Sequence, residues 1–366
     1  MLRLLTGLKC YCPQYIGEKD LLISYDKIIK ICNPNELSQS NIISSVINCE
    51  GLLAFPGLID QHVHIIGGGG EEGAISRIKE IEFEDIIAAG VTTVVGVLGA
   101  DSYTRSLENL LAKARGLEGE GLTTFIYTGS YSIPTVTITN SVASDLVLID
   151  KVIGTGEVAI SDHRSSQADL KELMSLAAET HIGGLIGGKA GVVHIHIGDG
   201  KDGLKPLLQV IEQTELPTTQ FIPTHVNRNL NLFAEAIDYC KMGGFIDLTA
   251  GETAGVSVPN AIEQLLQNGV DLTRVTVSSD ANGSIPNGGI GKIQVLYDDI
   301  VKCITDKNIS PDIAFSLAGE NVARVLKQHP KKGVLKEGSD ADILITDSNY
   351  KMQKLFCKGN LLKGES

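Results

Sequence analysis

The chain has 366 residues, 43% of them hydrophobic, and its 44 acidic against 31 basic residues give a net charge of −13. That charge argues against nucleic acid and anionic membranes as partners. No apolar run reaches the roughly 20 residues of a membrane-spanning helix, and the N-terminal sequence MLRLLTGLKCYCPQ lacks a signal-peptide cleavage site. The seven cysteines, an odd number spread along the chain, fit a reducing compartment. We therefore expect a globular, cytoplasmic protein.

The N-terminal part of the chain favours β structure. Residues 1–51 include DLLISYDKIIKIC, in which apolar and polar residues alternate as they do in a hairpin. The same residues contain no convincing long helical pattern. We expect strands here rather than helices.

From residue 52 to residue 283, short apolar runs alternate with segments of helical periodicity. The runs are mostly continuous rather than alternating in polarity, which is typical of parallel strands covered by helices. Helical spacing appears between them, at 169–180, 231–243 and 260–269. Eight strands alternating with helices predict an α/β fold, a (β/α)8 barrel of the TIM type. The eight runs are 52–64, 91–99, 123–131, 158–164, 192–198, 221–227, 244–251 and 275–283.

The C-terminal end returns to the chemistry of strands and turns. Residues 333–360 read GVLKEGSDADILITDSNYKMQKLFCKGN, with a turn expected near Gly338 and Asp340. Two β-rich ends that flank a barrel can pair with each other. We expect residues 1–54 plus 333–366 to form a small β-sandwich-like domain and residues 55–332 to form the barrel.

Histidines and one aspartate follow the ends of predicted strands. In barrels of this type the C-terminal ends of the strands form the active-site face. The first strand ends in His62 and His64, which are two residues apart and so face the same side. Strand five ends with His194 and His196, strand six with His225 and strand eight with Asp280. Imidazole nitrogens and a carboxylate are ligands that zinc prefers, so the pattern predicts a metal site above the barrel axis.

The order of these residues resembles the amidohydrolase superfamily of metal hydrolases. Longer stretches resemble one group within it, the bacterial isoaspartyl dipeptidases, and the similarity runs over essentially the whole chain, both β-rich ends included. These stretches are PGLIDQHVHIIGGGGEEG, TGSYSIP, AISDHRS, LPTTQFIPTHVNRN and SSDANGS.

The resemblance implies two zinc ions per subunit. His62 and His64 would hold the more buried ion together with Asp280, and His196 and His225 would hold the second. Asp280 would also act as the catalytic base. His194 shares the face of His196 but is expected to be structural or to support a ligand.

One ligand departs from the family pattern. In the family a carboxylated lysine near strand four bridges the two metals, whereas this chain has Glu157 in that place, with one extra residue just before it. Lys151 is the nearest lysine. A glutamate can bridge two cations through its two oxygens, and the glycines of GTG would let the backbone come closer. The alternative is a mononuclear site with Glu157 at the surface, since the strand prediction puts Glu157 at the start of strand four.

The resemblance also implies how the amino end of a substrate is read. The four glycines at 67–70, Gly69 among them, would let the backbone pass close to a bound ligand. Glu71 would then pair with the α-ammonium group of the substrate, while Glu72 is expected to face solvent.

Two arginines are expected to read the carboxylates of the substrate. Arg164 and Arg228, with Ser284, would hold the two free carboxylates of a β-linked aspartyl dipeptide. Tyr131 would donate a hydrogen bond to the developing oxyanion. Ala100 stands where the family often has a threonine that touches substrate, which leaves the fine specificity open.

The expected activity is hydrolysis of isoaspartyl dipeptides by a metal-activated hydroxide. The alternatives are another amidohydrolase, acting on a cyclic imide or an N-acyl amino acid, and a non-catalytic barrel. The resemblance also implies a homo-oligomer. The sequence leaves open the preferred residue after isoaspartate, the metal used in the cell and the number of subunits.

Overall fold

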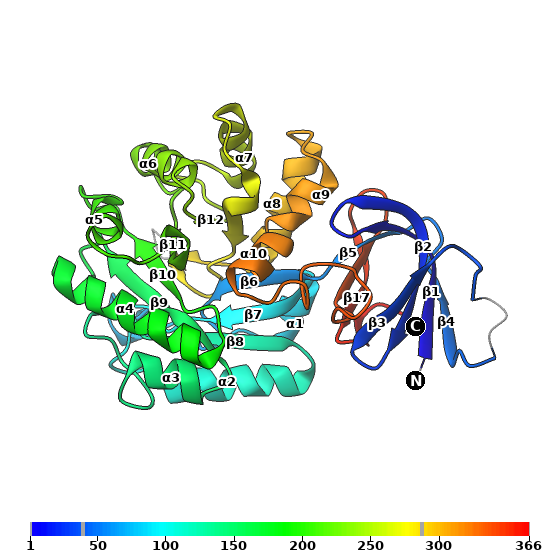
Figure 1. Cartoon of the computed structure of the whole chain (residues 1–366), viewed down its shortest axis with the longest axis horizontal. Helices are drawn as coiled ribbons and strands as arrows, with labels where there is room; N and C mark the ends of the chain where they lie inside the picture. Colours follow the sequence, from blue (N-terminus) through cyan, green and yellow to red (C-terminus); the bar gives the residue numbers. More distant parts are fainter. Residues whose placement is uncertain (1, 38–40, 286–288, 366) are drawn as a thin grey trace.

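The computed structural model describes residues 2–37, 41–285 and 289–365. The chain forms a part made of parallel strands and helices and a smaller part made of β-sheet (Figure 1). The helices are α1 Phe83–Ala88, α2 Leu107–Glu120, α3 Val142–Leu148, α4 Leu170–Gly187, α5 Lys205–Gln213, α6 Leu230–Lys241, α7 Val258–Gln267, α8 Gln294–Thr305, α9 Pro311–Ser316 and α10 Glu320–Val325. Short 3-10 turns lie at Ala74–Ser76, Thr218–Gln220 and Leu272–Arg274.

The smaller part is a sheet built from both ends of the chain. Its strands lie in the order β18-β17-β16-β5-β1-β2-β3, and β4 pairs with β1. Strand β5 therefore connects the N-terminal strands to the C-terminal ones, because it pairs with β1 on one side and β16 on the other. The strands are β1 Leu2–Tyr11, β2 Tyr15–Ser24, β3 Lys27–Cys32, β4 Ser45–Asn48, β5 Leu53–Pro56, β16 Ile343–Thr346, β17 Met352–Cys357 and β18 Asn360–Lys363.

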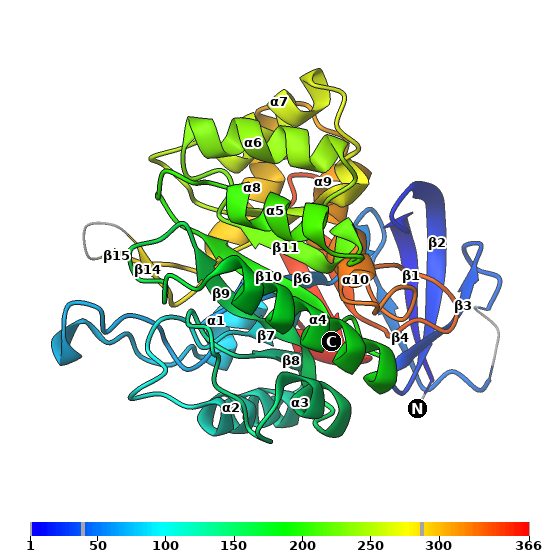
Figure 2. The ribbon, with the colours of Figure 1, turned by 60° about the vertical axis from the view of Figure 1, so that its left-hand side comes forward.

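The larger part holds eight successive parallel strands with helices outside them (Figures 1 and 2). Six strands form one parallel sheet in the order β11-β10-β9-β8-β7-β6, and β12 and β13 form a separate parallel pair. They are β6 Leu58–Val63, β7 Val91–Gly96, β8 Thr123–Thr128, β9 Val152–Ile160, β10 Val192–Ile197, β11 Phe221–Thr224, β12 Ile246–Thr249 and β13 Val275–Ser278. A short hairpin follows, β14 Ser284–Ile285 with β15 Gly289–Ile290.

The predicted closed barrel is shown only in part, because the hydrogen-bonded sheet is interrupted twice. Between β13 and β6 the chain after α9 intervenes: Val277 N donates to Leu317 O (3.0 Å) and Ile59 N to Ala318 O (2.7 Å). Between β11 and β12 a side chain takes the place of the ladder, since the Asn227 amide bonds both the N–H and the C=O of Thr249.

The expected strand four was placed too late in the chain. The run 158–164 was predicted, but β9 begins at Val152 and ends at Ile160. Two glycines and a glutamate interrupt the apolar pattern in the middle of the strand, which hid its first residues. The predicted helices at 169–180, 231–243 and 260–269 correspond to α4, α6 and α7.

The interior between the strands is apolar at one end and polar at the other. Near the N-terminal ends of the strands, α10 closes the space and packs against a buried apolar cluster that includes Ile59, Tyr127, Ile153 and Ile222. The buried histidines lie at the opposite, C-terminal ends. Apolar packing thus fills one end and leaves the other for polar side chains, as is usual for active sites of such folds.

Aromatic rings and a buried lysine stabilise the junction of the two parts. Phe55 of β5 stacks on Phe315 of α9, with ring centroids 3.9 Å apart. Lys332, 2% exposed, lies 2.8 Å from Asp340 Oδ2 and 2.6 Å from Asp342 Oδ2. These contacts tie the last barrel segment to the start of the C-terminal strands. Among the described residues, no helix combines the length and apolarity needed to cross a membrane.

Candidate active site

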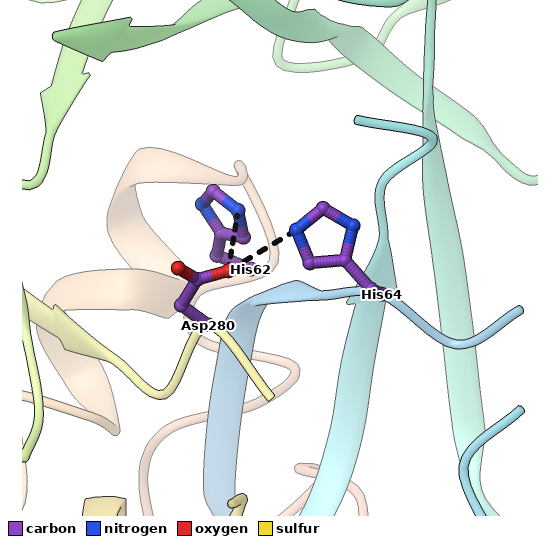
Figure 3. A group of neighbouring side chains, drawn as sticks. All are labelled: His62, His64 and Asp280. Carbon is purple, nitrogen blue, oxygen red and sulfur yellow. Dashed lines mark ion pairs between the residues drawn. The ribbon is translucent and has the colours of Figure 1, made fainter. Parts of the chain in front are cut away.

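Three of the expected ligands meet at the end of β6. His62 and His64 project from the end of this strand toward Asp280, which follows β13 (Figure 3). Their Nε2 atoms lie 3.4 Å and 3.1 Å from Asp280 Oδ1. An isolated β-bridge between Val63 and Ala281 brings the two segments together. The three side chains form a group whose ligand atoms could hold one metal ion.

Glu157 lies between this group and the other two histidines. Its Oε1 is 3.4 Å from Nε2 of both His62 and His64. Its Oε2 is 3.1 Å from His196 Nδ1 and 3.6 Å from His225 Nε2. The side chain is 1% exposed. The two oxygens of one buried carboxylate therefore face two separate pairs of imidazoles, and Glu157 is not a surface residue.

A β-bulge brings Glu157 into this position. Along β9 and β10, Thr155 pairs with Val193 and Val158 pairs with Ile195, so two residues of β9 oppose the single residue His194. A bulge of this kind bends its strand and redirects a side chain. The bulge adds one residue to β9 relative to β10, and Glu157 lies in the second half of β9 rather than before it.

Gly156 is required for the bulge to pack against β10. A Cβ atom at this position would lie 2.7 Å from the carbonyl oxygen and 2.8 Å from the Cβ of His194. We expect Gly156→Ala to lower the free energy of unfolding by about 1–3 kcal/mol through overpacking, and to lower metal retention because Glu157 is displaced. Denaturant unfolding and metal content measure the two effects.

The control for this substitution is Gly116→Ala, in the middle of α2. Nothing lies within 4 Å of a Cβ built there, so alanine is expected to stabilise the helix slightly. A Gly156→Ala protein as stable and as metal-rich as the wild type would show that the bulge tolerates a side chain.

Hydrogen bonds orient the two histidines of the second pair. His225 Nδ1 lies 2.7 Å from Thr249 Oγ1, and Nε2 points to Glu157. His196 Nδ1 faces both Glu157 and the Tyr131 hydroxyl, at 2.9 Å from the latter. The other ring nitrogen of His196 lies 2.9 Å from Asp162 Oδ2. Each ring thus has one nitrogen directed at Glu157 and the other held outside.

The electrostatics of the group favour a cation. Burial alone would raise the pKa of Glu157, but the surrounding histidines outweigh it and hold the pKa well below its ordinary value. Burial lowers the pKa of His225 to about 3, so this imidazole is neutral. For His62 burial acts downward, but Glu157 and Asp280 outweigh it and raise the pKa to about 9. The two carboxylates thus stabilise positive charge at this point, which a bound metal would supply in place of the proton on His62.

Unpaired atoms provide the test of whether a metal fits. His62 Nε2, Glu157 Oε1 and Asp280 Oδ1 are buried and have no hydrogen-bond partner among the described residues. Leaving such groups unpaired costs about 1–3 kcal/mol each, and more for charged groups. His62 Nε2 lies 3.4 Å from each of the two carboxylate oxygens, so cations bound among these atoms would satisfy them. The residues present therefore fit a divalent metal.

His194 contacts His62, one of the expected metal ligands, on the side away from the carboxylates. Its Nε2 lies 2.8 Å from His62 Nδ1, and its ring stacks on Tyr127 with centroids 5.0 Å apart. Burial lowers the pKa of His194 well below its ordinary value, so the ring is neutral. It therefore contacts the outer nitrogen of His62, the one turned away from Glu157 and Asp280.

The expected substrate-binding residues line a small pocket above the histidines. Glu71 Oε1 lies 3.3 Å from Arg164 NH1 and accepts a hydrogen bond from Ser284 Oγ at 3.2 Å. Arg228 lines the same pocket, and its guanidinium makes no hydrogen bond or ion pair within the described ranges. Among the lining residues are His64, Gly69, Glu71, Tyr131, Arg164, His196, Arg228, Asp280 and Ser284.

The glycines before Glu71 are needed for a reason that the sequence did not show. Gly67 and Gly69 have φ angles of 75° and 72°, and a Cβ there would lie 2.1 Å from Ile78 O and 2.4 Å from Ser76 O. The loop therefore folds back on residues 76–78. Only glycine has both the backbone freedom and the small volume for this path, and Gly69 still borders the pocket.

Sequence reasoning missed the carboxylates that hold the site from outside. Asp162 contacts both Arg164 and His196, and Asp60 Oδ1 accepts from the N–H groups of His62 and Ser279. Burial raises the pKa of Asp60 to about 7. The signal for Asp162 was its place near the end of a predicted strand, two residues before an arginine already selected. Asp60 gave no such signal, because it precedes the strand end.

The chain belongs to the amidohydrolase family. The model of that family matches residues 53–363. The fold and the buried group of histidines and carboxylates agree with this membership.

Individual proteins that are similar to the chain give a more specific comparison than the family does. The chain is 43% identical to the β-aspartyl dipeptidase of Fervidobacterium islandicum AW-1, solved with a β-Asp-Leu dipeptide; the match covers 100% of this chain and 97% of that one, with a TM-score of 0.94. N-acetylglucosamine-6-phosphate deacetylase from Pasteurella multocida shares the fold at 14% identity and a TM-score of 0.70. The imidazolonepropionase of Yersinia pseudotuberculosis is 29% identical over 123 residues, and that match spans only 30% of the curated relative.

Proposed function

We propose that the protein hydrolyses the β-peptide bond of isoaspartyl dipeptides in a reaction that depends on two metal ions. The observation that carries the proposal is Glu157, whose two oxygens face two separate pairs of histidines. Next to this group lies a pocket that carries charges of both signs. The likeness to a β-aspartyl dipeptidase with bound β-Asp-Leu supports the same activity.

The distances support one assignment of the residues that would hold the metals. His62, His64 and Asp280 would form one ligand set, His196 and His225 would form the other, and Glu157 would contribute one oxygen to each. We propose zinc, because imidazole and carboxylate ligands suit it. When bound, two such ions polarise a carbonyl and lower the pKa of water.

The charges of the pocket match an isoaspartyl dipeptide, which has one ammonium and two carboxylates. Glu71 pairs with the ammonium group. Arg228, whose guanidinium has no partner among the described residues, pairs with a carboxylate in a bidentate manner. Arg164 uses two of its nitrogens on Asp162, so NH1 remains for substrate, together with Ser284 Oγ. The ammonium and a carboxylate of the substrate thereby replace the Glu71–Arg164 contact.

Asp280 and Tyr131 are the residues that move or stabilise charge during the reaction. Asp280 takes the proton of the attacking water at Oδ2 and returns it to the amine nitrogen of the leaving group. Tyr131 donates a hydrogen bond from its hydroxyl to the carbonyl oxygen as negative charge develops there. Burial raises the pKa of Tyr131 well above its ordinary value, so the hydroxyl keeps its proton.

The substrates of the alternative activities would contact fewer of the charged residues in the pocket. A cyclic imide lacks the ammonium group that Glu71 would bind, and an N-acyl amino acid presents a single carboxylate. A non-catalytic barrel has no need of buried, unpaired ligand atoms. The dipeptide is therefore the substrate that the pocket fits best.

We also propose a cellular setting and an organisation for the chain. All seven cysteines are free, which suits the cytoplasm. Assembly into a homo-oligomer agrees with apolar side chains exposed on α3 and α4, namely Leu148, Leu185 and Ile186. Residues 1–54 plus 333–366 form the small β domain of the proposal, and residues 55–332 form the catalytic one.

The test is hydrolysis of β-Asp-Leu against α-Asp-Leu, with and without a metal chelator. The β-linked dipeptide is expected to be cleaved and the α-linked one left intact, because Glu71 and Arg228 are proposed to bind the ammonium and a carboxylate of the substrate, and the α linkage spaces the amide differently from these groups. Chelation is expected to abolish cleavage, and added zinc to restore it. Release of leucine measures the rate.

Two results would contradict the proposal. Equal cleavage of both dipeptides would show that the pocket does not read the linkage. Full activity after the chelator has removed all metal would show that the buried carboxylates and histidines work without cations.

A further inference from the structure

Asp162 lies between the metal ligands and the substrate pocket. It lies two residues after the end of β9, at the C-terminal edge of the strands, and its side chain is 3% exposed. Both of its oxygens are in use. Oδ1 accepts from the backbone N–H (2.7 Å) and Nε (3.0 Å) of Arg164, and Oδ2 accepts from Arg164 NH2 (2.8 Å) and lies 2.9 Å from His196 Nε2.

The contact with His196 determines which ring nitrogen can bind a metal. Nδ1 of this ring faces Glu157 Oε2 at 3.1 Å, while Nε2 faces Asp162. A carboxylate can only accept a hydrogen bond, so Asp162 favours the tautomer that carries its proton on Nε2 and leaves the lone pair on Nδ1, the nitrogen on the side of the other ligand residues. Outer carboxylates of this type orient histidine ligands and make them better donors.

The contact with Arg164 determines where its guanidinium lies. Held on two edges by Asp162, the group extends above the Tyr131 ring, with Cζ 5.3 Å from the ring centroid. Its NH1 then reaches Glu71 at 3.3 Å. Without Asp162, a long side chain that is 25% exposed would be free to adopt other rotamers.

We propose that Asp162 is a positioning residue that couples the second metal site to the substrate clamp, by holding His196 and Arg164 with one carboxylate. This inference rests on the proposed function for the role of Arg164. The coupling is direct because Arg164 NH2 and His196 Nε2 share one oxygen, Oδ2 of Asp162, and lie 3.2 Å apart. A shift of this oxygen therefore affects both residues.

The substitution Asp162→Asn tests this coupling with almost no change in volume. An amide has one acceptor oxygen and one N–H₂ donor, so it cannot accept from His196 and from both edges of Arg164 together. We expect the second cation to bind about 10–100-fold more weakly, as is found when outer partners of metal ligands are changed. We also expect KM for β-Asp-Leu to rise.

Arg164→Met separates the two roles. It leaves Asp162 on His196, so both cations are expected to bind as in the wild type while KM rises. The double variant D162N/R164M is expected to show the metal defect of Asp162→Asn and a KM no higher than that of Arg164→Met. Zinc affinity is measured by competition with a chromogenic chelator in the absence of substrate, and KM by leucine release.

The control is Asp299→Asn. Asp299 is also a buried carboxylate, 3% exposed, and accepts from the N–H of Gly251 at 2.8 Å, but it touches no histidine or arginine. Its substitution is expected to leave zinc affinity and KM unchanged. If Asp299→Asn weakened zinc binding and raised KM as much as Asp162→Asn, the effect of Asp162 would be general destabilisation. That result would overturn the proposed coupling.

Wild-type zinc affinity in Asp162→Asn would overturn the inference, whatever the KM. If circular dichroism shows that this variant does not fold, Asp162→Glu takes its place: it shifts the carboxylate by one methylene, so weaker zinc binding with raised KM supports the coupling and no change in either overturns it. Zinc affinity is independent of the substrate. A wild-type protein that binds zinc but does not cleave β-Asp-Leu would therefore reject the proposed function and still leave the metal test of Asp162 valid.

Discussion

Replacing Glu157 with alanine is expected to remove at least one of the two cations and to lower kcat/KM by more than about 100-fold. Each of its oxygens lies between a pair of imidazoles, at distances of 3.1–3.6 Å. Outer partners of metal ligands are already worth about 10–100-fold, so loss of a residue facing both pairs should exceed that range. Among the described residues grouped as possible metal ligands, Asp280 would then be the one carboxylate left.

The measurement is metal content per chain after dialysis, beside the rate of β-Asp-Leu hydrolysis. Glu72→Ala is the matched control, because Glu72 is a neighbour of the pocket loop but exposed. It should keep both ions and most of the activity. Two tightly held ions in Glu157→Ala would contradict the bridging role and favour a site completed without this residue.

Replacing Lys332 with methionine is expected to lower the free energy of unfolding by about 3–5 kcal/mol, the usual cost of removing one partner from a buried ion pair. The Lys332 side chain is 1% exposed, and its ammonium group contacts two carboxylates at 2.6–2.8 Å. Methionine fills the volume but leaves Asp342 and one oxygen of Asp340 without their cation. Lys27, which pairs with the other oxygen of Asp340, is only partly buried and cannot replace it.

The effect of Lys332 should depend on pH in a defined way. Burial lowers its pKa, but Asp342 and Asp340 outweigh burial and raise it above the ordinary 10.5. Burial raises the pKa of Asp340, but Lys332 and Lys27 outweigh it and lower the pKa below 3.8. The stabilisation is therefore complete between about pH 4 and pH 10, and it is lost as pH rises through the folded pKa of Lys332 or falls through that of Asp340.

Urea unfolding of the wild type and Lys332→Met across this pH range measures the difference. Lys331→Met is the control, because Lys331 is exposed and a surface substitution usually changes stability by less than about 0.5 kcal/mol. If Lys332→Met lowered the free energy of unfolding by less than 1 kcal/mol at neutral pH, the cost of desolvating the three charges would nearly cancel their attraction.

The order of strands and the strand-end histidines could be predicted because both follow from short-range patterns. Continuous apolar runs identify buried parallel strands, and side chains two apart on one strand share a face. The strand that failed, β9, carries a bulge with two glycines around it, and a bulge breaks the pattern on which the prediction depends. For the same reason the position of Glu157 in the fold was left open.

Contacts between distant residues could not be predicted from local patterns. The pairing of Glu71 with Arg164 joins residues 93 positions apart, and that of Asp162 with His196 joins residues 34 apart. The closure of the barrel depended on residues 317 and 318 and on the Asn227 side chain, which carry no strand signal. Such contacts result from the assembled fold, so the sequence indicated the residue types and not their partners.

The position of β5 between β1 and β16 has a consequence for the order in which the molecule forms. During synthesis the first five strands leave the ribosome early, but the partner that covers the other edge of β5 begins only at Ile343. Until then β5 presents an open edge to other nascent chains, a known risk for aggregation. The growing polypeptide therefore depends on β16 to protect a strand made some 290 residues before it.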